Sequence, residues 1–279
     1  MLPELTGQQF ALVSNFLSFA IACMGAGAVF FFIGAGVNRR YRLAVVVSGL
    51  VCAIAAYHYM RIYDSYVNAY TLQQIGGVIT YKATGAPFND FYRYADWFIT
   101  VPLLMVELIA VLGLARAEAR PLLLKLIVAT ALMIGLGFPG EISTDVSTRW
   151  FWFALSMIPF IYTLYVLYVE LGSALSRQPS QITGLIKLAR NVVILTWSFY
   201  PIAYALKTIF GTSIDGVFVA SAAGEVASQI GYSIADITAK VGYGMIIYFI
   251  AREKSELEGV DTALSVSGSK VSGTTPMTV

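Results

Sequence analysis

The chain has 279 residues, of which 58% are hydrophobic and only 12% are charged, against about 25% charged residues in an ordinary soluble domain. This composition excludes an ordinary soluble domain and is typical of a membrane protein. The formal net charge is only +2, so the composition does not indicate a nucleic-acid partner, and none is expected.

Seven apolar segments follow one another along the chain, each near the roughly twenty residues that cross about 30 Å of hydrocarbon as a helix. The residues before the first segment have neither the basic start nor the small-residue cleavage site of a secretory signal peptide, so the first helix is expected to be retained. We predict an all-α membrane protein, a seven-transmembrane-helix bundle that occupies residues 1–252. The segments lie at about 10–36, 42–66, 91–114, 120–138, 148–171, 187–209 and 226–252.

Two segments outside these helices carry patterns of their own. Residues 67–90, between the second and third helices, contain Gly76-Gly77, then the strand-like letters VITY, then Gly85, and this pattern predicts a short extracellular β-hairpin. From residue 253 the chain is rich in Ser, Gly, Thr and charged residues, which cannot bury enough apolar area to offset the entropy cost of ordering. We predict a disordered cytoplasmic tail over 253–279.

Basic residues are concentrated in every second connection between the helices. Short loops rich in Lys and Arg stay on the cytoplasmic side of a membrane. The amino terminus is therefore expected outside the cell, and the carboxyl terminus in the cytoplasm, of a multi-pass plasma-membrane protein. The basic residues behind this prediction are Arg39, Arg40, Arg42, Arg116, Arg120, Arg177, Lys187, Arg190, Arg252 and Lys254.

Several ionisable residues lie inside the predicted helices, where each costs at least a few kcal/mol and marks a functional site by default. Asp96 and Glu107 of the third helix are eleven residues apart, which places them about 20° apart around the helix and ~16 Å apart along it. Thr100 lies on the same face, and Arg93 lies about one turn nearer to the outside. The second helix contributes the only histidine, His58.

The last helix carries Asp236 and Lys240, which are four residues apart and therefore share a face. An ammonium group flanked by two carboxylates can stay charged in an apolar setting. A lysine in an apolar pocket can also form a Schiff base with a carbonyl compound, and a polyene aldehyde would suit aromatic walls. A purely structural Lys–Asp pair, a satisfied polar contact for His58 and ordinary packing of the aromatic residues are the alternatives. The joint arrangement of Lys240 with two acids toward the outside, Asp96 and Asp236, and one acid toward the inside, Glu107, favours a proton path around a buried amine.

The residues just described resemble those of the microbial (type-1) rhodopsins, and in particular of the proteorhodopsin and xanthorhodopsin-like outward proton pumps. The resemblance covers essentially all of 10–252. Its most specific motifs are YRYADWFITVPLLMVE at 92–107, RWFWFALSMIPF at 149–160, WSFYPIAY at 197–204 and YSIADITAK at 232–240.

This resemblance implies a retinal in the core of the bundle, with all-trans retinal bound covalently to Lys240 as a protonated Schiff base. It implies that Asp96 is the counterion and primary proton acceptor, Asp236 the second counterion, and Glu107 the cytoplasmic proton donor. Arg93 would balance the counterions, Thr100 would complete an Asp-Thr-Glu triplet, and His58 would hydrogen-bond the acceptor carboxylate. The matching pocket positions are Trp97, Leu104, Met133, Gly137, Phe153, Ser156, Trp197, Tyr200, Pro201 and Tyr204, of which Leu104 resembles the choice associated with green absorption.

The resemblance also implies a function, a light-driven ion transporter rather than an enzyme, which pumps protons outward across the lipid bilayer. Relatives often form pentamers or trimers, so a homo-oligomer is expected. Some xanthorhodopsin-like members have a glycine that opens a window for an antenna carotenoid; Phe153 stands there, so no such carotenoid is expected. A sensory rhodopsin of the same fold is an alternative that Glu107 disfavours, and a retinal-free transporter is a second. Sodium pumps of this group have Asn and Gln where this chain has Asp96 and Glu107, and chloride pumps have a neutral residue in place of the acceptor acid, so both functions are disfavoured.

Overall fold

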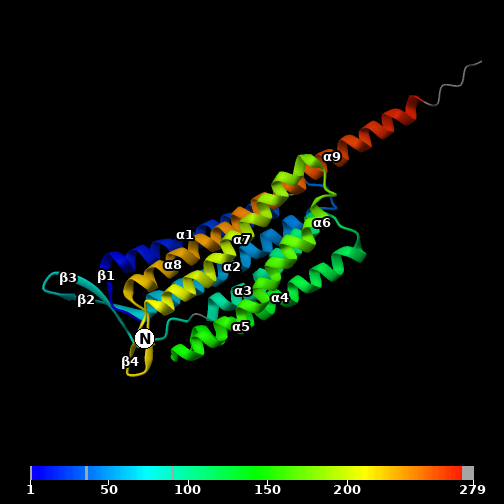
Figure 1. Cartoon of the computed structure of the whole chain (residues 1–279). Helices are drawn as coiled ribbons and strands as arrows, with labels where there is room; N and C mark the ends of the chain where they lie inside the picture. Colours follow the sequence, from blue (N-terminus) through cyan, green and yellow to red (C-terminus); the bar gives the residue numbers. More distant parts are fainter. Residues whose placement is uncertain (1, 35–36, 90, 272–279) are drawn as a thin grey trace, which may run out of the picture.

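The computed structural model describes residues 2–34, 37–89 and 91–271, with side chains described except at 75 and beyond 259. Seven helical spans in these residues are long and apolar enough to cross a membrane, which confirms the predicted bundle. They are α1 (Gly7–Ile33), α2 (Arg42–Ala69), α3 (Phe91–Leu112), α4 (Arg116–Ile142), α5 (Val146–Tyr165) continued by η1 (Val166–Glu170) and α6 (Leu171–Leu175), α7 (Ser180–Ile209), and α8 (Ala222–Ile237) continued by η2 (Thr238–Gly242) and α9 (Tyr243–Val271). Figure 1 shows them as one elongated bundle.

Side-chain caps fix the starts of several helices. Thr6 and Gln9 form a capping box at the start of α1, with Thr6 Oγ1 accepting from the Gln9 amide at 3.2 Å and Gln9 Oε1 accepting from the Thr6 amide at 2.9 Å. Asp145 accepts from the Thr148 amide at 2.6 Å at the start of α5. Each cap satisfies a main-chain donor that the first helical turn leaves without a partner.

The predicted hairpin between the second and third helices is present as β2 (Tyr70–Ile75) and β3 (Val78–Ala83), paired antiparallel with Ile75 opposite Val78. The two-residue turn between them is Gly76-Gly77, with φ of 59° and 83°. Positive φ at both turn positions suits the right-handed twist of the strands, and glycine adopts it without steric cost. A third short strand, β1 (Leu5–Thr6), pairs with the other edge of β3.

A second hairpin, which the sequence analysis did not predict, joins α7 to α8. It consists of β4 (Thr212–Ile214) and β5 (Val217–Val219) around Asp215-Gly216, which have φ of 50° and 76°. All five strands lie at one end of the bundle, and α9 extends from the opposite end (Figure 1). We call these the hairpin end and the tail end.

Helix α9 continues to Val271, past residue 253 at which the disordered tail is predicted to begin. Lys254 is buried, and its Nζ donates to the main-chain oxygens of Val111 and Leu112 at 3.2 and 2.8 Å. Polar residues beyond the apolar span thus find partners at the end of α3, which the composition of the segment did not indicate. Residues 272–279 of the predicted tail lie outside the described residues.

Candidate functional site

A buried lysine amine between two carboxylates forms the centre of the site. Lys240 lies in η2, one π-helical turn, and its side chain is only 2% exposed. Its Nζ is 2.9 Å from Asp96 Oδ2 and 3.1 Å from Asp236 Oδ1. The structure therefore brings α3 and the last span together through the three residues that the sequence analysis selected. Since both acids are almost fully buried, the ion pairs are shielded from solvent.

The two carboxylates differ sharply in their other hydrogen bonds. Asp236 accepts from Tyr59 Oη at 2.8 Å and from Trp97 Nε1 at 3.2 Å, and Tyr200 donates to it as well. Asp96 Oδ1 has no hydrogen-bond partner among the described residues. Hydrogen bonds to a carboxylate favour its charged form, so the two acids are unequal: Asp236 is held as a carboxylate much more strongly than Asp96.

His58 and Thr100 both lie beside Asp96, although neither hydrogen-bonds its carboxylate. His58 Nδ1 is 3.9 Å from Asp96 Oδ1, beyond hydrogen-bond distance, so the expected bond is not formed. The reason is local, because the same nitrogen lies 3.0 Å from the main-chain oxygen of Ile54, one turn earlier in α2, and donates there. Thr100 Oγ1 likewise donates to the main-chain oxygen of Asp96, at 2.8 Å.

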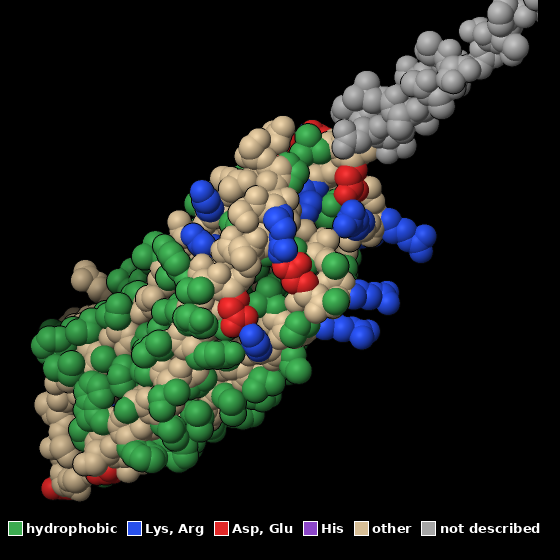
Figure 2. All heavy atoms as spheres, turned by 45° about the vertical axis from the view of Figure 1, so that its right-hand side comes forward, with side chains coloured by type: hydrophobic (Ala, Val, Ile, Leu, Met, Phe, Trp, Pro, Cys, Tyr) green, Lys and Arg blue, Asp and Glu red, His purple; other side chains and the backbone are tan. Residues whose placement is uncertain are grey.

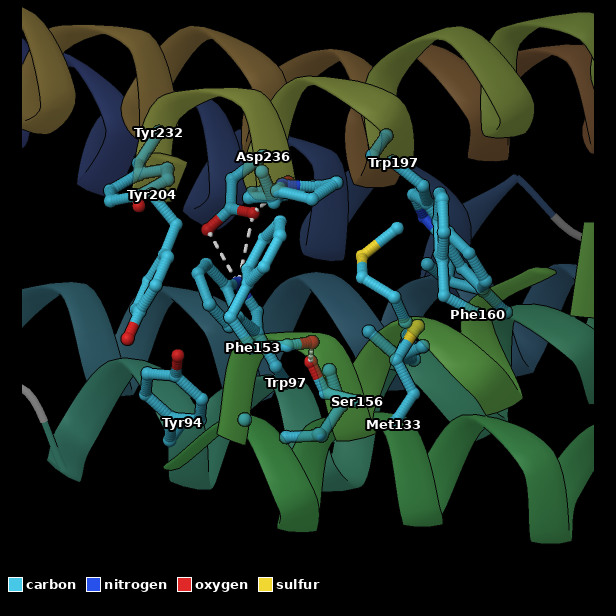
Figure 3. Close-up of a pocket in the computed structure, with 18 residues that line it drawn as sticks. Tyr94, Trp97, Met133, Phe153, Ser156, Phe160, Trp197, Tyr204, Tyr232 and Asp236 are labelled. Atoms are coloured by element: carbon cyan, nitrogen blue, oxygen red, sulfur yellow. Dashed lines mark hydrogen bonds between the residues drawn. The ribbon is translucent and has the colours of Figure 1, made fainter. Parts of the chain in front are cut away.

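A pocket adjoins this centre, and eight of the eighteen residues that line it are aromatic (Figure 3). All ten predicted pocket positions line it, together with Asp236, whose carboxylate contacts the Lys240 amine. Lining residues that the sequence analysis did not select are Tyr94, Val101, Ile134, Met157, Phe160, Tyr232 and Ala239.

A third buried acid, Glu107, lies on α3 toward the tail end, on the opposite side of the amine from Arg93. It is 0% exposed. Ser48 of α2 hydrogen-bonds its Oε2, and its Oε1 has no hydrogen-bond partner among the described residues. A carboxyl group in this setting would be costly as an unpaired charge, so the geometry suits one that keeps its proton at rest.

The model of the family described as "Bacteriorhodopsin-like protein" matches residues 11–254. The chain belongs to the bacteriorhodopsin-like family. Among curated relatives, this bacteriorhodopsin-like protein is 28% identical over 236 residues to the blue-light absorbing proteorhodopsin of Gamma-proteobacterium Hot 75m4, covering 84% of each chain.

Two solved structures resemble this bacteriorhodopsin-like protein over nearly its whole length. A thermophilic rhodopsin has a TM-score of 0.84 and 50% identity, with 93% of this chain and 100% of that chain covered. Xanthorhodopsin, described as a light-driven ion pump with dual chromophore, has a TM-score of 0.83 and 47% identity, with 93% and 99% covered. The fold and family of this chain are thereby established as those of a microbial rhodopsin.

Three further site residues of this bacteriorhodopsin-like protein, outside the pocket lining, were not selected from its sequence. Tyr59 donates to Asp236 and also accepts from Arg93 Nη1 at 3.3 Å, and Gln229 Oε1 accepts from Arg93 Nη2 at 2.6 Å. Ser48 bonds Glu107. A signal exists for Gln229, which precedes Asp236 by seven residues, two turns on one helical face. Tyr59 and Ser48 stand among many similar residues, and no spacing singles them out.

Proposed function

We propose that this rhodopsin is a light-driven outward proton pump that carries all-trans retinal on Lys240. The observation that carries the proposal is the inequality of the acids around the buried amine. Within the part of the chain that the structure describes, Asp236 accepts several hydrogen bonds, Asp96 has an oxygen without a hydrogen-bond partner, and Glu107 lies apart on the tail side with only a serine as hydrogen-bond partner. The names of the relatives, a proteorhodopsin and a light-driven ion pump, support it.

The residues around the pocket fit retinal. The lining combines aromatic and aliphatic walls with few polar groups, which suits a polyene, and a primary amine stands beside Asp236 at its edge. When bound, retinal would supply light absorption and isomerisation, and through a protonated Schiff base at the Lys240 nitrogen it would weaken the hold of that nitrogen on its proton. Trp97 and Trp197 would help to hold its chain.

The residues of the chain then divide the proton transfers between them. Asp96, 2.9 Å from the Lys240 nitrogen and with an open second oxygen, would accept the proton. Asp236 would stay ionised because three donors besides the amine hold its carboxylate. Glu107 would return a proton to the nitrogen from the other side. Directed transfer works against the membrane potential, at about 2.3 kcal/mol per charge and 100 mV.

The distribution of charge supports outward transport. Exposed Lys and Arg side chains gather toward the tail end, as Figure 2 shows, and such residues favour the cytoplasmic side. With the tail end in the cytoplasm, Asp96 and Arg93 face the outside and Glu107 faces the cytoplasm. The hairpin end and the amino terminus would then be extracellular.

The proposal extends to the partners of the chain. An antenna carotenoid is not expected, because the Phe153 ring fills its position and stacks on Tyr204 with centroids 5.4 Å apart and planes 6° apart. The expected pentamer or trimer also stays a prediction, and cross-linking in the native membrane measures it directly.

The test is illumination of cells that express the protein with added retinal, in weakly buffered medium. Sustained external acidification that a protonophore abolishes supports pumping, and Asp96→Asn should remove it at equal expression. Borohydride reduction followed by mass spectrometry should find retinal on Lys240. A slow photocycle without acidification would instead favour a sensory receptor, and absence of visible absorbance after retinal addition would favour a retinal-free transporter.

A further inference from the structure

A row of buried charges continues from the site to the hairpin end of the bundle. It begins at Arg93, whose Nη2 donates to Gln229 Oε1 at 2.6 Å, and Gln229 Nε2 donates to Glu225 Oε1 at 2.9 Å. Lys207 of α7 lies 3.3 Å from Glu225 Oε2 and 3.3 Å from Glu141 Oε1. Arg149 of α5 closes the row, 3.3 Å from Glu141 Oε2.

This row, Arg93–Gln229–Glu225–Lys207–Glu141–Arg149, alternates in sign at every charged member. Its charged side chains are at most 7% exposed, and they come from α3, α4, α5, α7 and α8. Buried charges of this kind are costly unless each is paired. Apolar residues at these positions would hold the helices together at a lower free-energy cost of desolvation. The row is therefore expected to have a function beyond packing.

The inner end of the row indicates that role. Gln229 is a single amide that joins Arg93 to Glu225, and Arg93 Nη1 also bonds Tyr59 Oη at 3.3 Å, which in turn donates to Asp236. Arg93 therefore stands between an inner acid, Asp236, and an outer acid, Glu225, and its charge acts on both. The balance between these two acids determines how much positive charge faces the proton-accepting side of the site.

We infer that Glu225 is a positioning residue, which acts through Gln229 to hold Arg93 toward the hairpin end and so sets the positive charge felt at Asp96. Lys207, anchored by Glu141 and Arg149, keeps Glu225 ionised and in place. The inference rests on the proposed function, because it assigns Glu225 to the outward half of the same proton path.

Each element packed around Glu225 contributes a polar or charged group that faces it. Lys207 comes from α7, Arg93 from α3, Gln229 from α8, Tyr66 from α2 and Tyr70 from β2. Burial raises the pKa of Tyr70, Glu225 raises it further, and Lys207 lowers it. Among the described residues, Lys207 and Arg93 are the cations that bear on Glu225.

The experiment is a pH titration of the visible spectrum of the purified, retinal-loaded protein, which follows the protonation of Asp96 through the acid colour change. Two nearly isosteric substitutions should move this change in opposite directions. Glu225→Gln removes a negative charge and releases Arg93 toward the site, so the change should move to lower pH. Gln229→Glu adds a negative charge beside Arg93, so it should move to higher pH.

The expected size follows from the helix geometry. Glu225 precedes Asp236 by eleven residues, ~16 Å along α8, and the charge of Glu225 acting directly at that distance in protein corresponds to a shift of roughly half to one pH unit. The release of Arg93 adds to this direct shift. Ser228→Ala, at a buried residue of the same helix outside the row, should leave the titration unchanged. In an Arg93→Gln background the Glu225→Gln shift should fall to the direct part, because Arg93 transmits the rest.

Shifts of one sign in both variants, an unchanged titration, or a Glu225→Gln shift that is undiminished without Arg93 would overturn the inference. Lost stability alone does not move a colour change in opposite directions, so the pair separates positioning from a structural role. The titration does not depend on transport. A wild-type protein that fails to acidify its medium would refute the proposed function, whereas the Glu225 result is read independently.

Discussion

Ser48→Ala offers a sharp test of the role assigned to Glu107. The Ser48 hydroxyl is within reach of two acceptors, the main-chain oxygen of Ala44 at 3.2 Å and the Glu107 carboxyl group. It is the only hydrogen-bond partner of Glu107 that the described residues provide. With a neutral Glu107, the carboxyl O–H can donate to Ser48 while Ser48 donates to Ala44. Once Glu107 has given up its proton, Ser48 can turn to the carboxylate.

The magnitude follows from that single bond. A hydrogen bond to a charged group contributes about 1.5–3 kcal/mol and one to a neutral group about 0.5–1.5 kcal/mol, so Ser48 favours the deprotonated form of Glu107 by roughly 1 kcal/mol. Its loss should slow proton donation about fivefold. The colour should not change, since Glu107 is ~16 Å from Asp96 along α3.

Flash photolysis of the purified protein in lipid discs measures the recovery of the resting spectrum. Thr163→Ala is the matched control, because Thr163 is also fully buried and its hydroxyl bonds only the main-chain oxygen of Pro159 on its own helix, at 2.8 Å. An unchanged recovery in Ser48→Ala, or equal slowing in both variants, would refute the reasoning. Addition of azide, a diffusible proton donor, should restore the rate.

Three further substitutions test the remaining residues of the site. Asp96→Asn should shift absorption to the red and stop pumping, and an unshifted spectrum would count against its role as counterion. Glu107→Gln should leave the colour nearly intact and slow recovery more than Ser48→Ala does; recovery that azide does not accelerate would argue against Glu107 as donor. His58→Ala should alter the pH of the colour change, since its ring lies 3.9 Å from Asp96 Oδ1, and an identical titration curve would leave His58 without that role.

The sequence predicted most of the fold because membrane helices are specified by length and composition. The seven spans and the first hairpin could be located, the latter from a Gly-Gly turn between strand-like residues. The β4–β5 hairpin was missed because its strands have only three residues each, although Asp215-Gly216 is a turn signal. The contacts from Lys254 to the end of α3 were not predicted, because they depend on how α9 packs against α3.

The site was predictable to the extent that charge in an apolar helix is conspicuous. Asp236 and Lys240 could be paired by helical spacing and Asp96 selected by its charge, and the structure places each carboxylate within 3.1 Å of the Lys240 amine. Partners from helices distant in the sequence could not be found that way, because their contacts depend on how the helices pack. Tyr59 is the clearest case, and the bond of His58 to its own helix instead of to Asp96 is another.

The π-helical turn at Lys240 has a consequence for the rest of the last span. A π-turn holds more residues than an α-turn, so α9 is out of phase with α8. If Thr238–Gly242 adopted α-helical geometry instead, everything downstream would rotate by about 100°, the angle of the one extra residue that the π-turn accommodates. Tyr243 would then lose its 3.4 Å contact with Leu104, and Lys254 its bond to Leu112. The position of the Lys240 amine and the packing of α9 against α3 at the tail end therefore depend on the same helical register, so a change that shifts one also shifts the other.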